Sequence, residues 1–284
     1  MSRAYPAPAK LNLMLRVVGQ RADGYHELQT VFQFIDLHDT LYFESLPPGS
    51  IHRTGGPAGV AETADLTVRA AQKLLTESNV REGVHIHIDK QLPLGGGIGG
   101  GSSDAATTLL ALNQLWNLGF SRTELMAMGV SLGADVPVFL FGQSAWGEGI
   151  GERLVAMPEL PEAHYVLLHP GVSVATREIF AAPELTRQHA PITISAFLDG
   201  VTENTLETTV RRRYPGIDRA LDWLQAQGLH HARLTGSGAC CFALASDAQS
   251  AQQIVATVPK PWRAWAVRGC NRHPLHDLVR DTLF

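Results

Sequence analysis

The chain has few of the features that mark secreted, membrane-spanning or nucleic-acid-binding proteins. Its 284 residues include three cysteines, two of them adjacent at Cys240 and Cys241, and this number and spacing predict neither a disulfide framework nor a zinc site. No apolar run reaches the roughly 20 residues of a membrane-spanning helix, and residues 1–6 lack the basic start and apolar stretch of a signal peptide. We therefore expect a cytoplasmic protein with no membrane partner.

Positive charge is also scarce. Lys and Arg number 23 against 27 Asp and Glu, and the net charge of −4 predicts no nucleic-acid partner, because such proteins usually carry a basic surplus or stripe. The one basic cluster, residues 211–213, is typical of a solvated helix face. Hydrophobic residues make up 45% of the chain, as in ordinary globular proteins, and its length favours two domains over one.

Glycine, by contrast, is concentrated in one place. Residues 95–101 hold six glycines among seven. Residues 84–88 alternate apolar and polar side chains, which predicts a strand, and residues 104–118 carry apolar residues at helical spacing, with Ser102 or Ser103 as the expected N-cap. Closely spaced glycine amides in front of a helix N-terminus form an anion site, so the segment predicts a phosphate-binding loop.

Other interpretations of this loop fit less well. A flexible linker seldom lies between a strand and a capped helix. A Walker loop needs a lysine where residues 102–104 read Ser-Ser-Asp. Gly95, Gly97 and Gly100 match the dinucleotide fingerprint, but a second strand is not expected at the required distance behind them.

Periodicity outlines the rest of the chain as alternating strands and helices. The stretch around Pro158 and Pro161 is the weakest, so we expect domains at 1–155 and 156–284. Strands are predicted at 10–18, 30–44, 84–88, 165–169, 239–245 and 262–267, and helices at 64–77, 104–118, 217–227 and 249–258.

Asp135 is the best candidate for a reacting carboxylate. It lies in the segment Gly133-Ala-Asp-Val-Pro137, behind a helix opened by the capping box Ser121-x-x-Glu124. An aspartate before Val-Pro is also a natural N-cap for a following helix, and the local sequence favours that structural role.

Three further groups of polar residues are candidates for binding. Lys10 and Asn12 alternate with leucines on a strand, so we expect both to point the same way, away from the core, although a lone strand lysine is usually solvated. Tyr25 and His26 follow an Asp-Gly turn and suit recognition of a base, with a packed tyrosine and a surface histidine as the alternative. The strand residues His85 and His87 share a face, but without a third ligand they do not predict a metal site.

The glycine loop and three other segments together resemble the GHMP small-molecule kinases, named for galactokinase, homoserine, mevalonate and phosphomevalonate kinases. The segments occur in family order over nearly the whole chain: Ala7-Pro-Ala-Lys-Leu-Asn-Leu13, 93–103, Gly133-Ala-Asp-Val-Pro-Val138 and Leu234-Thr-Gly-Ser-Gly-Ala-Cys240. With Arg21-Ala-Asp-Gly-Tyr-His26, they are similar to the branch that phosphorylates a cytidine diphosphate alcohol. The resemblance implies an α+β fold with a ribosomal S5-like N-terminal domain, a ferredoxin-like C-terminal domain and the active site between them.

The resemblance also implies roles for individual residues. Asp135 would be the catalytic base, with Lys10 beside it to stabilise charge at the γ-phosphate. The ATP-binding residues would be Pro93, Leu94, Gly95, Gly96, Gly97, Ile98, Gly99, Gly100, Gly101, Ser102 and Ser103. The substrate-binding residues would be Asn12, Tyr25, His26, Thr176, Phe180, Gly236, Ser237 and Gly238, with Phe180 opposite Tyr25 and His26 across the cytidine.

The expected activity is ATP-dependent phosphorylation of the 2-hydroxyl of a cytidine diphosphate derivative of methylerythritol, in isoprenoid precursor synthesis. The cofactor would be ATP with Mg²⁺, whose protein ligand is not indicated, since neither Glu148 nor Glu152 has compelling spacing. Asp65 stands where relatives often carry asparagine near the nucleotide base, so the adenine contacts stay open. The alternatives are another GHMP kinase such as homoserine kinase, a non-catalytic nucleotide-binding module and, more remotely, a dehydrogenase. Either a monomer or a homodimer is expected.

Overall fold

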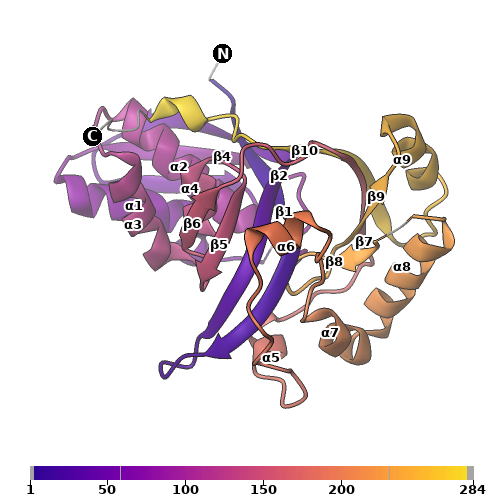
Figure 1. The fold of residues 1–284 in the computed structure, drawn as a ribbon. Coiled ribbons are helices and arrows are strands. Elements are labelled where there is room, and N and C mark those ends of the chain that lie inside the picture. The colour runs from indigo at the N-terminus through magenta and orange to yellow at the C-terminus, as the bar shows by residue number, and fades with distance from the viewer. Residues whose placement is uncertain (1–2, 58, 230, 280–284) are drawn as a thin grey trace.

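A computed structural model describes residues 3–57, 59–229 and 231–279. A ten-stranded sheet runs through these residues in the order β3-β4-β2-β10-β7-β9-β8, with β1 and β5 also paired to β2 and β6 paired to β5. Helices from the first half of the chain gather at one end of this sheet, and the helices within residues 207–255 gather at the other, while the short helices at 176–180 and 194–198 lie near the two long central strands (Figure 1). Among the described residues, none of the helices has the length and apolar character to cross a membrane.

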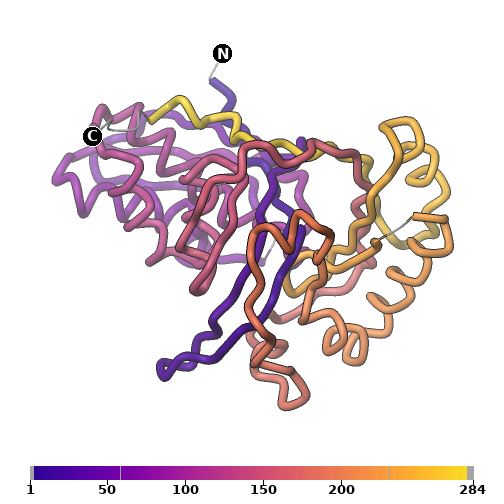
Figure 2. The backbone as a smooth tube through the Cα atoms, viewed as in Figure 1, coloured from indigo at the N-terminus to yellow at the C-terminus, as the bar shows by residue number. Residues whose placement is uncertain are grey.

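Two long antiparallel strands form the centre of the fold. β1 (Tyr5–Gln20) pairs with β2 (His26–Leu46), and the register shifts at three places along the pair. Their hairpin extends beyond the helices of the first half of the chain to a turn at residues 21–25, as the indigo trace shows (Figure 2). Both predicted strands are confirmed, and each extends beyond its predicted ends.

The first half of the chain packs four helices on its strands. β3 (Ile51–Gly55), β4 (Gly83–Asp89), β5 (Ala145–Gly149) and β6 (Arg153–Ala156) complete this part of the sheet. The helices are α1 (Leu66–Ser78), α2 (Gly100–Leu115), α3 (Arg122–Leu132) and α4 (Val136–Phe141), preceded by a short 3₁₀ turn η1 (Glu62–Ala64). Helix α2 is buried along most of its length, and its apolar residues join a core with Phe34, Leu74 and Phe139.

The second half adds its own strands and helices. The strands are β7 (His164–His169), β8 (Arg233–Leu234), β9 (Cys241–Ala245) and β10 (Arg263–Cys270). The helices are α5 (Thr176–Phe180), α6 (Ile194–Leu198), α7 (Glu207–Arg213), α8 (Pro215–Ala226) and α9 (Ala248–Val255). Predicted strands and helices in this half are confirmed with ends shifted by a few residues.

Strand β10 joins the two halves. It pairs with β7 along its length and with β2 at its end, where Gly269 opposes Ile35. The chain then returns to the first group of helices through η2 (His276–Leu278), and Leu275 enters the same core as Phe34 (Figure 1). The division into 1–155 and 156–284 stays a prediction, and the outermost residues of both ranges lie outside the described part of the chain.

One predicted boundary is wrong. Helix α2 begins at Gly100, inside the glycine run, and its N-cap is Gly99 rather than Ser102 or Ser103. Gly99 has a φ of 74°, a conformation that glycine adopts without steric cost, and its carbonyl accepts the first helical hydrogen bond from the Ser103 amide at 2.8 Å. Both serines therefore lie in the first turn of the helix.

Candidate functional site

Asp135 and Lys10 meet although 125 positions separate them in the numbering of the chain. The Lys10 Nζ lies 3.3 Å from the Asp135 Oδ2, with the lysine side chain 2% exposed and the aspartate 35% exposed. Asp135 does occupy the N-cap position of α4, but its side chain makes no capping hydrogen bond. Its carboxylate is turned to the lysine instead, so the structural role favoured by the local sequence is not the one that its side chain plays.

Lys10 is held in a network of oxygen acceptors. Its Nζ donates to the Asn12 Oδ1 at 2.6 Å and to the Gly97 carbonyl at 3.0 Å, and it lies 5.6 Å from the centre of the Phe32 ring. The expected common direction of Lys10 and Asn12 is thereby confirmed. The alternative of a solvated lysine is wrong, because a buried ammonium here has charged and polar partners on several sides.

The glycine loop adopts backbone conformations that other residues rarely take. Gly95, Gly97 and Gly99 have φ values of 65°, 70° and 74°. A Cβ added at Gly97 would lie 2.4 Å from the Thr235 carbonyl oxygen, and one at Gly99 would lie 2.8 Å from the Phe139 ring. Glycine is required at both positions by backbone conformation and by close approach.

The second glycine segment, residues 234–240, is hydrogen-bonded directly to the first. The amides of Ala239 and Cys240 donate to the carbonyls of Gly95 and Gly96, each at 2.9 Å. Thr235 is fully buried, and its Oγ1 accepts a hydrogen bond from the backbone N–H of Asn12 at 3.0 Å. The loop, the late turn and strand β1 therefore form one hydrogen-bonded unit.

A cleft of about 270 Å³ opens between these segments. The predicted site residues that line it are Lys10, Asn12, Gly97, Ser102, Asp135, Thr176, Phe180, Gly236 and Ser237. The Thr176 and Ser237 hydroxyls lie 2.7 Å apart at this wall. The geometry brings one exposed carboxylate, one buried ammonium and the end of a glycine loop to a single cavity.

The other predicted site residues do not line the cleft. Tyr25 and Leu94 are 60% and 50% exposed. Ser103 is fully buried, and its Oγ has no hydrogen-bond partner within the described ranges. The rest of the predicted loop, Pro93, Gly95, Gly96, Ile98, Gly99, Gly100 and Gly101, continues from the cleft into α2, and Gly238 ends the late turn.

His26 and Phe180 form an aromatic contact near the hairpin turn. Their ring centres are 5.0 Å apart, and the His26 Nε2 accepts a hydrogen bond from the Arg187 Nε at 3.1 Å. Burial and, less strongly, the Arg187 charge lower the pKa of His26 below its usual value. The alternative of a packed tyrosine beside a surface histidine is wrong, because Tyr25 is exposed while His26 is buried.

Three ionisable side chains next to the loop, Asp39, Lys90 and Asp104, were not predicted from the sequence. The Lys90 Nζ contacts the Asp39 Oδ2 at 2.6 Å and the Asp104 Oδ2 at 2.7 Å, and the other Asp39 oxygen accepts from the amides of Gln91 and Leu92. Burial raises the pKa of Asp104 to about 7 against the opposing effect of Lys90. A lysine three residues before Pro93 was the available signal, but its partners come from distant segments.

The side chains considered for metal binding do not gather. The described residues contain no group of three or more His, Cys, Asp or Glu side chains suited to a metal ion. The Glu148 Oε1 accepts from the Trp146 indole and from Gln29, each at 3.2 Å, and the Glu152 Oε2 accepts from the Ile150 amide. His85 and His87 flank the Thr54 hydroxyl on the exposed face of the sheet.

Comparison with known families places these features in context. The profile of the GHMP kinases N-terminal domain matches residues 65–143, and that of the GHMP kinases C-terminal domain matches residues 181–264. The chain belongs to the GHMP kinase family. The α+β kinase fold and the resemblance inferred from the four motifs are confirmed.

Within this family, similar proteins share one name. Proteins from Chromohalobacter salexigens (51% identity, 96% of this chain and 93% of the relative) and Thiobacillus denitrificans (51%, 99% and 100%) are 4-diphosphocytidyl-2-C-methyl-D-erythritol kinases. A crystal structure of 4-(cytidine 5'-diphospho)-2C-methyl-D-erythritol kinase superimposes with a TM-score of 0.83 at 35% identity, covering 95% of this chain and 100% of that one. A homoserine kinase from Cytophaga hutchinsonii shares the fold, with a TM-score of 0.71 at 17% identity.

Proposed function

We infer that the chain catalyses ATP-dependent phosphorylation of the 2-hydroxyl of 4-diphosphocytidyl-2-C-methyl-D-erythritol, a step of non-mevalonate isoprenoid precursor synthesis. The relatives named above, about half identical over nearly the whole chain, support this activity. The structural observation that supports the phosphoryl-transfer reaction is the 3.3 Å contact between Lys10 and Asp135 in the cleft beside the glycine loop. A non-catalytic nucleotide-binding module would have no use for a carboxylate held there.

Asp135 is assigned as the general base. Its partly exposed carboxylate accepts the proton of the 2-hydroxyl as the hydroxyl oxygen attacks the γ-phosphorus, and the bond to the leaving ADP breaks in the same in-line displacement. The proton then passes from Asp135 to solvent. No phosphoenzyme is needed, because positioning and charge stabilisation lower most of the barrier.

Lys10 and the loop stabilise negative charge. The lysine ammonium is fixed by Asn12 and Gly97 at the point where it can face both the base and the transferring phosphoryl group. The amides of residues 95–102 and the N-terminal end of α2 would face the triphosphate, which is the usual arrangement for anion binding at a helix start.

The substrate is held on the opposite side of the cleft. Thr176 and Ser237 offer hydroxyls, Asn12 offers a side-chain amide, and the glycines at 236 and 238 let the turn approach the diphosphate closely. Phe180 lies at the cleft wall and contacts His26, so the cytosine would stack near these rings with Tyr25 beside them.

Mg²⁺ would enter with ATP. The Ser102 hydroxyl lines the cleft and is a hard oxygen donor of the kind that this ion accepts, with phosphate oxygens supplying further ligands. When bound, the ion would neutralise charge on the phosphates.

The activity is tested by measuring ATP consumption with three acceptors: the cytidine diphosphate alcohol, homoserine and mevalonate. We expect turnover with the first alone, with the product phosphorylated on the 2-hydroxyl. Turnover with homoserine or mevalonate in its place would assign the chain to another branch of the family. Absence of turnover with all three would contradict the proposed activity.

A further inference from the structure

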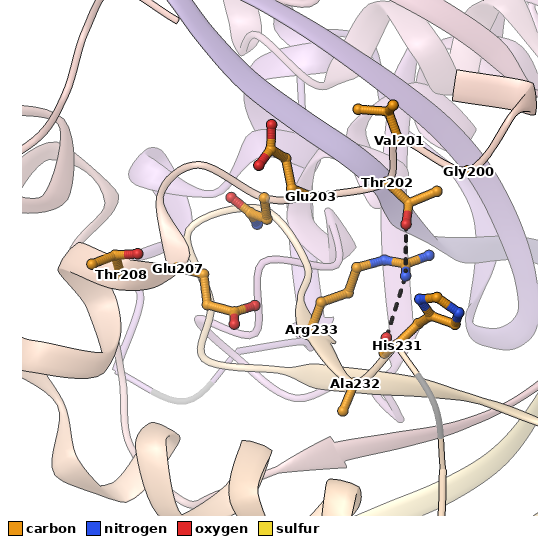
Figure 3. Close-up of a pocket in the computed structure, with 10 residues that line it drawn as sticks. Gly200, Val201, Thr202, Glu203, Glu207, Thr208, His231, Ala232 and Arg233 are labelled. Atoms are coloured by element: carbon orange, nitrogen blue, oxygen red, sulfur yellow. Dashed lines mark hydrogen bonds between the residues drawn. The ribbon is translucent and has the colours of Figure 1, made fainter. Parts of the chain in front are cut away.

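A second hollow, larger than the cleft, lies next to the late glycine turn. It has a volume of about 540 Å³ and is lined by residues 200–204, 207–208 and 231–233. Figure 3 shows Arg233 within the hollow, where it donates to the Thr202 hydroxyl and the His231 carbonyl. The hollow is therefore better understood as the rear support of the turn than as a ligand site.

Asn204 connects this hollow to the turn through two hydrogen bonds. It is 6% exposed, and its Nδ2 donates to the carbonyls of Leu234 at 2.9 Å and Gly236 at 2.8 Å. Its Oδ1 accepts from the Leu206 amide at 3.0 Å. Both N–H donors and the oxygen of this side chain are thus engaged, which fixes its orientation.

The contact with Gly236 determines where the next amide points. The peptide bond between Gly236 and Ser237 is trans, so its carbonyl and its N–H point in opposite directions. Since the carbonyl is turned to Asn204 at the rear, the Ser237 N–H is turned toward the cleft that Gly236 and Ser237 line. Within the described ranges, no backbone carbonyl accepts a hydrogen bond from this amide.

The same segment is anchored on the strand that carries Lys10. The Leu15 amide donates to the Glu203 carbonyl at 3.1 Å, and the Thr205 amide donates to the Leu15 carbonyl at 2.8 Å. Asn204 therefore has a fixed position relative to β1 and holds the turn at a set distance from the reacting groups on that strand.

We propose that Asn204 is a positioning residue, which orients the Gly236–Ser237 peptide so that the Ser237 N–H donates to the diphosphate of the alcohol substrate. The proposal rests on the proposed function, because it needs a phosphate-bearing ligand at this wall. Asn204 does not touch the substrate and acts only through the turn.

The test compares Asn204→Asp with the wild type. The aspartate keeps the oxygen that accepts from Leu206 but replaces the two donors with an oxygen facing two carbonyls, so the peptide should rotate. We expect the affinity for CDP to fall about tenfold or more, as for loss of one hydrogen bond to a charged group, and the affinity for cytidine to stay within twofold. The substrate KM should rise similarly while the ATP KM is unchanged.

Thr208→Ala is the matched control, since Thr208 lines the same hollow, is exposed, and should leave all four constants unchanged. Equal losses for CDP and cytidine, or no loss, would overturn the proposal. If Asn204→Asp does not fold, Asn204→Ser retains one donor and should give a smaller loss that is again confined to CDP. Failure of the wild type to phosphorylate the cytidine diphosphate alcohol would count against the proposed function instead, independently of the CDP comparison.

Discussion

At the scale of single residues, the cleft is defined by one lysine and one aspartate whose surroundings differ. Lys10 is sealed by protein acceptors, whereas Asp135 remains partly open to solvent. A base must both receive and release a proton, so the open member of the pair is the one suited to that task.

Asp135→Asn tests this assignment. The amide cannot accept the hydroxyl proton, so we expect kcat to fall by about 10² to 10⁴, while ATP affinity stays within a few-fold because the glycine loop is intact. Initial rates and ATP titrations measure the two quantities. Asp199→Asn, at an exposed helix end, is the control. Near-normal kcat in the Asp135 variant would refute its role as base.

Gly97→Ala tests the tight junction between the two glycine segments. The new methyl would meet the Thr235 oxygen at 2.4 Å and the Gly238 oxygen at 2.8 Å, so the loop must move. We expect a lower melting temperature and loss of ATP affinity. Gly171→Ala is the matched control, because Gly171 has a φ of 77° with open space around it, and it should cost only the ~1–2 kcal/mol of left-handed backbone. Equal effects of the two substitutions would argue against close packing at the junction.

At the scale of elements, the glycine loop is held by the buried ion cluster of Asp39, Lys90 and Asp104. It ties β2 to the start of the loop and to the N-terminal part of α2. Removing the central ammonium would leave the buried Asp39 carboxylate without its counter-ion and Asp104 without its cationic hydrogen-bond partner.

Lys90→Met is therefore expected to lower the free energy of unfolding by about 3–5 kcal/mol at neutral pH. Urea denaturation measures this. Lys73→Met removes a surface partner of Glu77 and should cost less than about 0.5 kcal/mol. A loss for Lys90→Met no larger than for Lys73→Met would mean that the cluster contributes little to stability.

Element positions were largely predictable from the sequence, and contacts across elements were not. The period of apolar residues indicated α1 within two residues at its start, because its buried face repeats at helical spacing. The same periodicity misplaced the start of α2, because the glycines at its beginning have no side chains and so show no apolar spacing. Asp135 could be singled out from its motif, but Thr235 and Asn204 could not, since the Thr235 contact joins residues 223 positions apart.

At the scale of the whole molecule, the segment after β10 is a second structural link. The His273 amide donates to the Gly142 carbonyl at 3.0 Å, its Nδ1 accepts from the Leu275 amide at 3.0 Å, and its ring meets Phe34 edge-on. Burial, followed by the nearby His276 and Arg122 charges, lowers the pKa of His273 to about 3.

This linkage predicts acid sensitivity. The unfolded chain binds a proton at His273 near pH 6.5, whereas the folded protein does so only near pH 3, so stability should fall as pH drops through that window. The raised pKa of Asp104 has the opposite effect on the pH dependence of stability, so wild type and His273→Gln are compared directly. Between pH 7 and pH 5, the free energy of unfolding of His273→Gln should fall less than that of the wild type. If urea denaturation shows the same change in the free energy of unfolding with pH for both proteins, the role of His273 is contradicted.

The pairing of β10 with β2 also has a consequence for the newly made chain. Strand β2 is synthesised early, but one of its neighbours, together with Leu275 of the first core, emerges only when residues 263–279 have been added. Asp135, Lys10 and both glycine segments have all been synthesised before then, without the strand that completes the sheet beside them. A nascent chain therefore contains every residue of the proposed site for some time before its fold can bring them together.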